Sequence, residues 1–285
     1  MLENRYDVVL VFDVTRGNPN GDPDAGNYPR VDGLTGLGVV SNHSLKRKMR
    51  DALKSIHGDD VSLYTRRGAN LSKTQDEVVA DMVRDGVAKN KKELTSNHQD
   101  ALVSEMQRRF DDVRLFGAVV TCINRGITGP VQVTDAVSVD RIAPENMGIT
   151  CVAGSGEKNG ESRSQNMGNR WLVPYGLYVA HMDILQTACR GSADNQCSQE
   201  DVDRLLDAVT HMFDMHRTST SGEQVLRRMI VFKHSTRLGD QPVHQLYDAV
   251  RIERKCEGLP TSYEDYDVTV DRSRVRDTVE VIEMV

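Results

Sequence analysis

Five cationic side chains crowd into one short stretch of the chain, and their spacing suits a ligand that carries phosphate. They are Lys46, Arg47, Lys48, Arg50 and Lys54. Apolar residues recur between them at intervals of three and four, which predicts a helix over residues 41–56 with one apolar stripe, formed by Leu45, Met49, Ala52, Leu53 and Ile56. The cations fill the remaining faces of that helix.

The start of the predicted helix favours an anion as well. Ser41, Asn42 and Ser44 lie where an N-cap belongs. A helix that begins after a glycine-rich loop offers free amide groups and the positive end of its dipole to an anion. A solvated surface helix docked by its apolar stripe has the same pattern. The preceding loop therefore matters for the interpretation.

That loop covers residues 16–30 and reads RGNPNGDPDAGNYPR. A loop of this length between a predicted strand and a predicted helix is either functional or disordered. Arg16 and Arg30 bracket it, and the amides of Asn18 and Asn20 can donate to phosphate or to base edges. The alternation of Asn and Asp resembles the start of a calcium loop, but Pro23 stands where an EF-hand needs glycine.

Composition limits the class of protein. The chain has 285 residues, a formal net charge of -6 and a mean hydropathy of -0.48. The acidic balance argues against indiscriminate nucleic-acid binding but leaves room for a local basic groove. No apolar run approaches the roughly 20 residues that span a bilayer. The amino-terminal residues lack the apolar region of a signal peptide, so a cytoplasmic location is expected.

Familiar catalytic and metal motifs are missing from the sequence. The five cysteines are scattered, without a C-x-x-C pair or a zinc spacing. The glycines fit neither a P-loop nor a dinucleotide fingerprint, and no G-x-S-x-G occurs. We therefore expect no cofactor and no metal.

The order of predicted elements indicates an α+β fold with a modified ferredoxin-like, RRM-type βαββαβ core. Its predicted members are strands at 6–15, 113–124, 171–184 and 225–234, and helices at 41–56 and 200–216. Helices at 74–87 and 97–110 read as an inserted layer, joined by a solvated basic linker at 89–92. The alternating segment 127–142 suits a projecting hairpin. Shorter strands are predicted at 61–64, 250–253, 268–270 and 279–284.

Several motifs together resemble a known family. They are the run from Phe12 through the glycine-rich loop to Asn27, Leu45-Lys-Arg-Lys-Met-Arg50, Gly129-Pro-Val-Gln132, Tyr175-Gly-Leu-Tyr178 and Phe232-Lys-His-Ser-Thr-Arg-Leu-Gly-Asp240. In this order they resemble the CRISPR-associated backbone subunit of the type I-C surveillance complex, Cascade (the seventh Cas family, in the RAMP superfamily). The turn at 214–222 departs from the His-Asp-Arg-Ser run that the family often has, so no role is assigned to it.

The resemblance implies a non-catalytic, multi-copy subunit for antiviral defence. Copies would polymerise head to tail along a CRISPR guide RNA and present it for pairing with target DNA. Further expected partners are the RNA-processing RAMP subunit, the large Cascade subunit and a recruited helicase-nuclease, with no membrane. Residues 1–285 would form one RRM-like palm, with helical fingers inserted at 61–112 and a thumb hairpin and loop at 125–170.

Combining the residue patterns with the resemblance gives a predicted RNA-binding set. It consists of Arg16, Asn18, Asn20, Arg30, Asn42, His43, Lys46, Arg47, Arg50, Arg125, Arg163, Asn166 and Arg170.

One alternative stays open at this point, a metal-dependent RNase. Backbone subunits of type III complexes are related in fold and cut target RNA with a loop aspartate. Asp22 and Asp24 lie in the loop beside the candidate phosphate-binding cations, where a carboxylate can serve a metal or act as a base. Aspartates also flank prolines and glycines in turns for conformational reasons alone, and that is the simpler interpretation.

Overall fold

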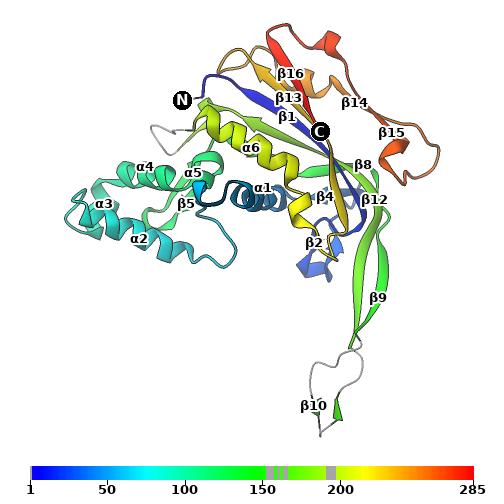
Figure 1. Cartoon of the computed structure of the whole chain (residues 1–285), viewed down its shortest axis with the longest axis horizontal. Helices are drawn as coiled ribbons and strands as arrows, with labels where there is room; N and C mark the ends of the chain where they lie inside the picture. The colour runs from blue at the N-terminus through cyan, green and yellow to red at the C-terminus, as the bar shows by residue number, and fades with distance from the viewer. Residues whose placement is uncertain (1, 152–156, 159–160, 163–165, 191–196) are drawn as a thin grey trace.

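The computed structural model describes the chain except residues 1, 152–156, 159–160, 163–165 and 191–196 (Figure 1). For eight further residues the structure describes the backbone alone; these are residues 150–151, 157–158, 161–162 and 166–167. No helix in the described ranges is long and apolar enough to cross a membrane.

An antiparallel sheet forms the centre of the molecule, and β1 (Tyr6–Gly17) lies in its middle. The strand order is β16-β13-β1-β12-β8-β4, with β7 and β9 also paired to β12. The bounds of these strands are β4 (Leu37–Val40), β7 (Val131–Val133), β8 (Ala136–Arg141), β9 (Glu145–Cys151), β12 (Asn166–Ile184), β13 (Glu223–His234) and β16 (Val279–Met284). The predicted strands at 6–15, 171–184, 225–234 and 279–284 are confirmed.

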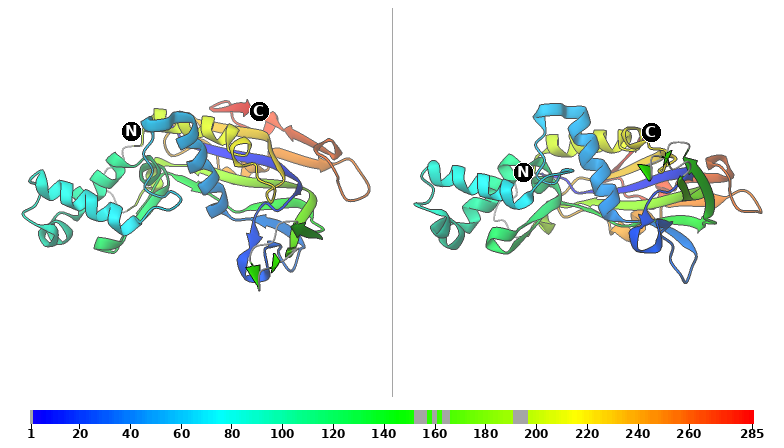
Figure 2. Two further views of the ribbon diagram at one scale, coloured as in Figure 1. Left: turned by 60° about the horizontal axis from the view of Figure 1, so that its bottom comes forward. Right: turned by 90° about the horizontal axis from the view of Figure 1, so that it is seen from below.

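Each face of the sheet carries a different layer. Alternate residues of β1 pack on opposite sides, Val8 and Leu10 in one core cluster and Val9 and Val11 in another, as the two-residue period of a strand requires. Helices α1 (Asn42–His57) and α6 (Gln199–His211) cover the first face (Figures 1 and 2). The second face is covered by α7 (Val243–Tyr247) and by the pair β14 (Val250–Arg254) and β15 (Tyr266–Val270).

The prediction for the helix at 41–56 is confirmed with one correction. Leu45, Met49 and Leu53 are buried in the core as the spacing requires. Lys48, predicted to lie on a cationic face, is only 7% exposed. Its ammonium donates to the Ser44 hydroxyl at 3.1 Å, one turn back. Burial lowers the pKa of Lys48 to about 8 because the charged form loses water.

A helical cluster with its own apolar core lies beside the sheet (Figure 1). Its members are α2 (Leu71–Arg84), α3 (Lys91–Asn97), α4 (Gln99–Arg109), α5 (Asp111–Phe116), β5 (Gly117–Val120) and β6 (Arg125–Thr128). The helices predicted at 74–87 and 97–110 are confirmed within a few residues. The predicted linker at 89–92 instead contains the start of α3, where the Asn90 side chain caps the helix.

The core strand predicted at 113–124 is wrong. Residues 111–116 form α5, which ends at Gly117 with a φ of 83°, and β5 then pairs with β6 in a separate two-stranded sheet. A short apolar run fits a buried helix as well as a strand, so periodicity did not distinguish them. The strand predicted at 61–64 is also absent from this described segment. The backbone there is held by carboxylates: Asp111 accepts from the Ser62 amide and Asp112 from the Tyr64 amide, each at 2.7 Å.

The alternating segment 127–142 does not project. Its strands β7 and β8 pair with β12 inside the sheet, and β6 before them belongs to the helical cluster. The hairpin that extends away from the sheet is formed by β9 and the first part of β12 (Figure 1), with β10 (Glu157–Lys158) and β11 (Glu161–Ser162) beyond it. A period of two identifies strands but not their partners.

Short elements complete the described chain. The glycine-rich loop contains the pair β2 (Gly21–Asp22) and β3 (Tyr28–Pro29). Single 3-10 turns lie at Pro23–Ala25, Gly58–Asp60, Thr121–Ile123, Gln186–Ala188, Asp214–His216, Tyr263–Asp265 and Arg272–Arg274.

Candidate nucleic-acid interface

The start of α1 is already occupied by polar groups of the same chain. The Ser41 amide donates to the Asn20 side-chain oxygen at 2.8 Å, and the Ser44 amide donates to the Ser41 hydroxyl at 3.3 Å. The Asn42 amide and its side chain both donate to one carboxylate oxygen of Asp135, at 2.7 and 2.8 Å. Because a carboxylate already neutralises this end of the dipole, the predicted phosphate site at the helix start receives no support.

Arg50 is a structural side chain rather than a free cation. Its Nε lies 2.9 Å from the carboxylate of Asp112, and the two side chains are 13% and 1% exposed. Asp112 also accepts from the amides of Tyr64 and Thr65, at 2.7 and 3.0 Å. The Arg50 guanidinium lies 4.7 Å from the centre of the Phe116 ring. Arg50 therefore fixes α1 to the segment at 64–65 and to α5.

The neighbouring cations are more available to a ligand. The Lys46 ammonium lies 5.9 Å from the centre of the Phe116 ring. Burial, and then the nearby Arg50 charge, lower the pKa of Lys46. Arg47 is 56% exposed and lies 3.6 Å from Asp51 in a loose pair. Asp51 is itself held by His216, whose Nε2 lies 2.8 Å away. Because His216 lies closer to Asp51 than Arg47 does, the Arg47 side chain can leave Asp51 and reach a phosphate.

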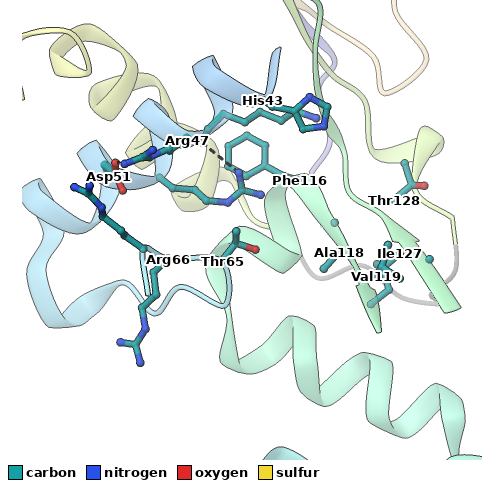
Figure 3. A pocket seen from close by; sticks show the side chains of 15 residues that line it. His43, Arg47, Asp51, Thr65, Arg66, Phe116, Ala118, Val119, Ile127 and Thr128 are labelled. Atoms are coloured by element: carbon teal, nitrogen blue, oxygen red, sulfur yellow. Dashed lines mark hydrogen bonds and ion pairs between the residues drawn. The ribbon is translucent and has the colours of Figure 1, made fainter. Parts of the chain in front are cut away.

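These cations line a cleft of about 780 Å³ between α1, the segment at 65–67 and the β5–β6 hairpin (Figure 3). Phe116, Ala118, Val119 and Ile127 contribute apolar surface to it, and Val119 is 59% exposed. The cationic lining residues are His43, Lys46, Arg47, Arg50, Arg66 and Arg67, and Phe116 lies against two of them, Lys46 and Arg50. The cleft thus combines cationic and apolar side chains, which suits a chain of sugar, phosphate and bases.

Arg66 and Arg67 are functional candidates that the sequence prediction missed. Both are exposed, and neither has a carboxylate within 4.0 Å among the residues that the structure describes. An exposed guanidinium without a partner stands out in a chain with more carboxylates than cations. The signal in the sequence is the run Arg66-Arg67-Gly68, two adjacent cations followed by a residue typical of turns.

Most predicted ligands in the glycine-rich loop at residues 16–30 already bond to other parts of the chain. Arg16 is exposed in a left-handed conformation, with a φ of 48°. Asn18 is only 7% exposed, and its amide donates to the Asn27 carbonyl at 2.7 Å. Asn20 holds the Ser41 amide. Arg30 pairs with Asp22 at 3.3 Å. Of these four side chains, Arg16 alone has no internal contact with another residue that the structure describes, so it can meet a ligand without losing one.

The remaining predicted residues either do not line the cleft or lie outside the description. Arg125 pairs with Asp100 at 2.6 Å on the helical cluster. Arg170, on the extended hairpin, donates to the Ser219 carbonyl at 2.7 Å. Arg163 and the side chain of Asn166 lie outside the described residues. The structure therefore brings together His43, Lys46, Arg47 and Arg50 from the predicted set, and adds Arg66 and Arg67.

Of the two loop aspartates, Asp22 has a turn-forming role. Asp22 accepts from the Asp24 amide at 3.2 Å, caps the turn Pro23–Ala25 and pairs with Arg30. Asp24 is exposed. In the described ranges no group of three or more His, Cys, Asp or Glu side chains gathers as a metal site.

One curated relative and several solved structures are similar to this chain. A protein described as "CRISPR-associated protein Cas7" from Haloferax volcanii is 25% identical over 222 residues, which cover 71% of this chain and 62% of the relative. The chain thus spans less than two thirds of that relative's length.

The solved structures are more distant. A chain of a "CRISPR RNA-guided surveillance complex, pre-nicking" has a TM-score of 0.49 and 19% identity, covering 80% of this chain and 75% of that one. A chain of a "CRISPR RNA-guided surveillance complex" has a TM-score of 0.44 and 16% identity, covering 80% and 68%. A chain of a "Type III-B Cmr-beta bound to cognate target RNA" has a TM-score of 0.45 and 12% identity, covering 80% and 61%.

The family assignment depends on a longer match than any of these. Residues 4–271 match the family described as "CRISPR-associated protein Cas7". Because that match extends over nearly all of the 285 residues, the chain belongs to the Cas7 family.

Proposed function

We propose that this protein is the guide-RNA-binding backbone subunit of a type I-C Cascade complex, present in several copies. The observation that carries the proposal is the cleft beside α1, where Lys46, Arg47, Arg66 and Arg67 face apolar surface in a chain of net charge -6. Cations confined to one groove bind a phosphate backbone regardless of sequence, while the acidic remainder disfavours binding elsewhere.

The proposal includes the architecture of the subunit. The strand order β13-β1-β12-β8, with α1 and α6 on one face, supports an RRM-type palm. The cluster α2–α5 would be the fingers and the β9–β12 hairpin the thumb, so the thumb would start near residue 145 rather than 125. The cleft would then lie where palm and fingers meet, so that both units hold the same RNA.

The subunit would act without catalysis of its own. Asp22, one of the two carboxylate candidates, is engaged by Arg30 and by the turn that it caps. Assembled particles would be incubated with complementary RNA and Mg²⁺ or Mn²⁺. We expect intact RNA. Regularly spaced cuts that disappear in Asp22→Ala or in Asp24→Ala would instead make the subunit an RNase.

RNA binding is tested by the salt dependence of affinity. The double variant Arg66→Gln/Arg67→Gln would be compared with wild type in filter binding, with two unrelated guide sequences and a series of KCl concentrations. Each lost phosphate contact should lower the slope of log affinity against log salt by about 0.7, equally for both sequences.

The matched control is Arg272→Gln, because that side chain is 62% exposed and pairs with Glu283 far from the cleft in sequence and fold. It should bind as wild type does. A double cleft variant with an unchanged affinity and slope would overturn the assignment of the cleft.

A further inference from the structure

A rigid turn at residues 235–240 follows β13 and is held from below by buried polar groups. His234 is fully buried, and its Nδ1 accepts from the Asp240 amide at 2.8 Å while its Nε2 lies 2.8 Å from Asp7. Because Nδ1 accepts, the proton is on Nε2 and is donated to the Asp7 carboxylate. The imidazole thus fixes the end of the turn to the central strand β1.

Further contacts fix the other backbone groups of the turn. The Asp240 carboxylate accepts from the Ser235 amide at 2.6 Å. Arg5 donates to the Leu238 carbonyl at 3.3 Å, and its side chain lies where a Cβ on Gly239 would come within 2.9 Å. Gly239 has a φ of 94°, which favours glycine. These contacts hold the backbone of the turn in place within the copy itself.

The tip of this turn points its side chains away from all of that support. Leu238 is 71% exposed, and Arg237 is exposed without a carboxylate within 4.0 Å in the described part of the chain. A preorganised tip with an apolar and a cationic side chain loses little entropy when it binds, so it suits a protein contact.

A hollow of about 380 Å³ between α2 and α4 has the complementary chemistry. Met82, Val87 and Ala101 line it with apolar surface, and Val87 is 40% exposed. Glu105 at its edge is engaged by Arg108 and Arg109, at 2.7 and 2.5 Å. Asp85, 59% exposed, has a loose contact with Arg84 at 3.3 Å and no second cation within 4.0 Å among the described residues. Asp85 is therefore the carboxylate that a new cation can reach.

We propose that the turn at 235–240 of one copy seats in the α2–α4 hollow of the next copy, with Leu238 against Val87 and Ala101 and Arg237 beside Asp85. The two halves are different surfaces of the chain, so a copy can use one surface toward each of two neighbours, and we propose this heterologous arrangement, which repeats from copy to copy. This inference rests on the multi-copy assembly that we propose above, and it names the surfaces that join the copies.

The test separates binding of one copy from contact between copies. Affinity would be measured on a short RNA that holds a single copy, and copies per long RNA would be counted by native mass spectrometry across protein concentrations. Leu238→Ser should bind the short RNA as wild type does. On the long RNA its neighbour affinity should fall about tenfold or more, because burial of a leucine side chain is worth that factor.

Leu34→Ser is the matched control, because Leu34 is 91% exposed at another loop tip. It should assemble as wild type does. An equal loss in both serine variants would mean a general effect of removing a surface leucine, and would overturn the assigned contact. Unchanged assembly of Leu238→Ser would overturn it as well.

Charge reversal identifies the partner surface. Arg237→Glu and Asp85→Lys should each reduce neighbour affinity several-fold, and the double variant should regain most of it, because each copy then carries both reversed surfaces. A double variant that is worse than either single variant would contradict the pairing. Normal assembly of wild type on the long RNA together with unchanged assembly of Leu238→Ser would overturn this inference alone. Wild type that binds the short RNA but gathers no further copies would also overturn the multi-copy part of the proposed function, and failure on both RNAs would remove that function altogether.

Discussion

Two arginines that line the same cleft should respond in opposite ways to the same substitution. Arg50 pairs with buried Asp112, whereas Arg67 is exposed and without a carboxylate partner in the described chain. Arg50→Gln leaves the Asp112 carboxylate with only two backbone donors, the amides of Tyr64 and Thr65. Breaking a buried ion pair on one side costs about 3 kcal/mol or more. Arg67→Gln should change stability by less than about 0.5 kcal/mol.

The expected readouts are a melting temperature and a salt slope. At roughly 2–4 °C per kcal/mol for a chain of this size, Arg50→Gln should melt about 6–12 °C below wild type. Arg67→Gln should have the melting temperature of wild type but lose one phosphate contact. The slope of log affinity against log salt should then be shallower by about 0.7. The ratio of wild-type affinity to variant affinity should therefore be about 2.5-fold larger at 50 mM salt than at 200 mM salt.

Thermal unfolding by circular dichroism and RNA binding by fluorescence anisotropy would be measured on the same preparations. The reasoning is refuted if Arg50→Gln melts within 1 °C of wild type and lowers the salt slope, because Arg50 would then be a ligand contact. It is also refuted if Arg67→Gln lowers the melting temperature and leaves the slope unchanged.

Three further predictions concern stability. Gly17→Ala should destabilise the fold by about 1–3 kcal/mol in chemical denaturation, because the new Cβ would lie 2.0 Å from the Ser221 carbonyl oxygen. Gly33→Ala, which has open space around the new Cβ, should be close to neutral in the same assay. The pKa of Lys48 is about 8 in the folded chain and 10.5 in the unfolded chain. Below pH 8 the buried charge therefore lowers the free energy of unfolding by roughly 3 kcal/mol, and this destabilisation disappears as the pH rises to about 10.5. Lys48→Met should therefore be more stable than wild type at pH 7, with the gap closing by pH 10.5; a gap that widens with pH would contradict the assigned cause. Asp135→Ala should lower the melting temperature by the equivalent of about 1 kcal/mol through loss of the contact at the start of α1, with RNA affinity retained; a large loss of affinity would return the helix start to the binding site.

The sequence by itself determined the elements whose pattern is long and regular. The apolar spacing of residues 41–56 was enough for α1, and the unbroken apolar run of residues 8–12 was enough for the central strand β1. Such patterns are reliable because one face, or both, must be buried. The specific run at the amino-terminal end also led to the family, which the match over residues 4–271 bears out.

Short segments were decided only by tertiary contacts. Residues 113–124 are apolar enough for a core strand, yet they form α5 and a small hairpin because Asp111 and Asp112 bind the backbone at 62–65 and Gly117 ends the helix. The segment 127–142 alternates as predicted, but its strands β7 and β8 pair with β12 instead of forming a hairpin with each other. Strand partners depend on residues distant in sequence, which a local pattern does not contain.

The same limit applies to the candidate site. The sequence identified the cations of α1 but could not tell which of them already had partners. Arg50 and Lys48 are committed inside the fold, Asn20 and Asp135 occupy the start of the helix, and Arg66 and Arg67 enter the cleft from a turn. Whether a cation is free depends on the carboxylates that the fold brings to it, and only the tertiary structure decides that.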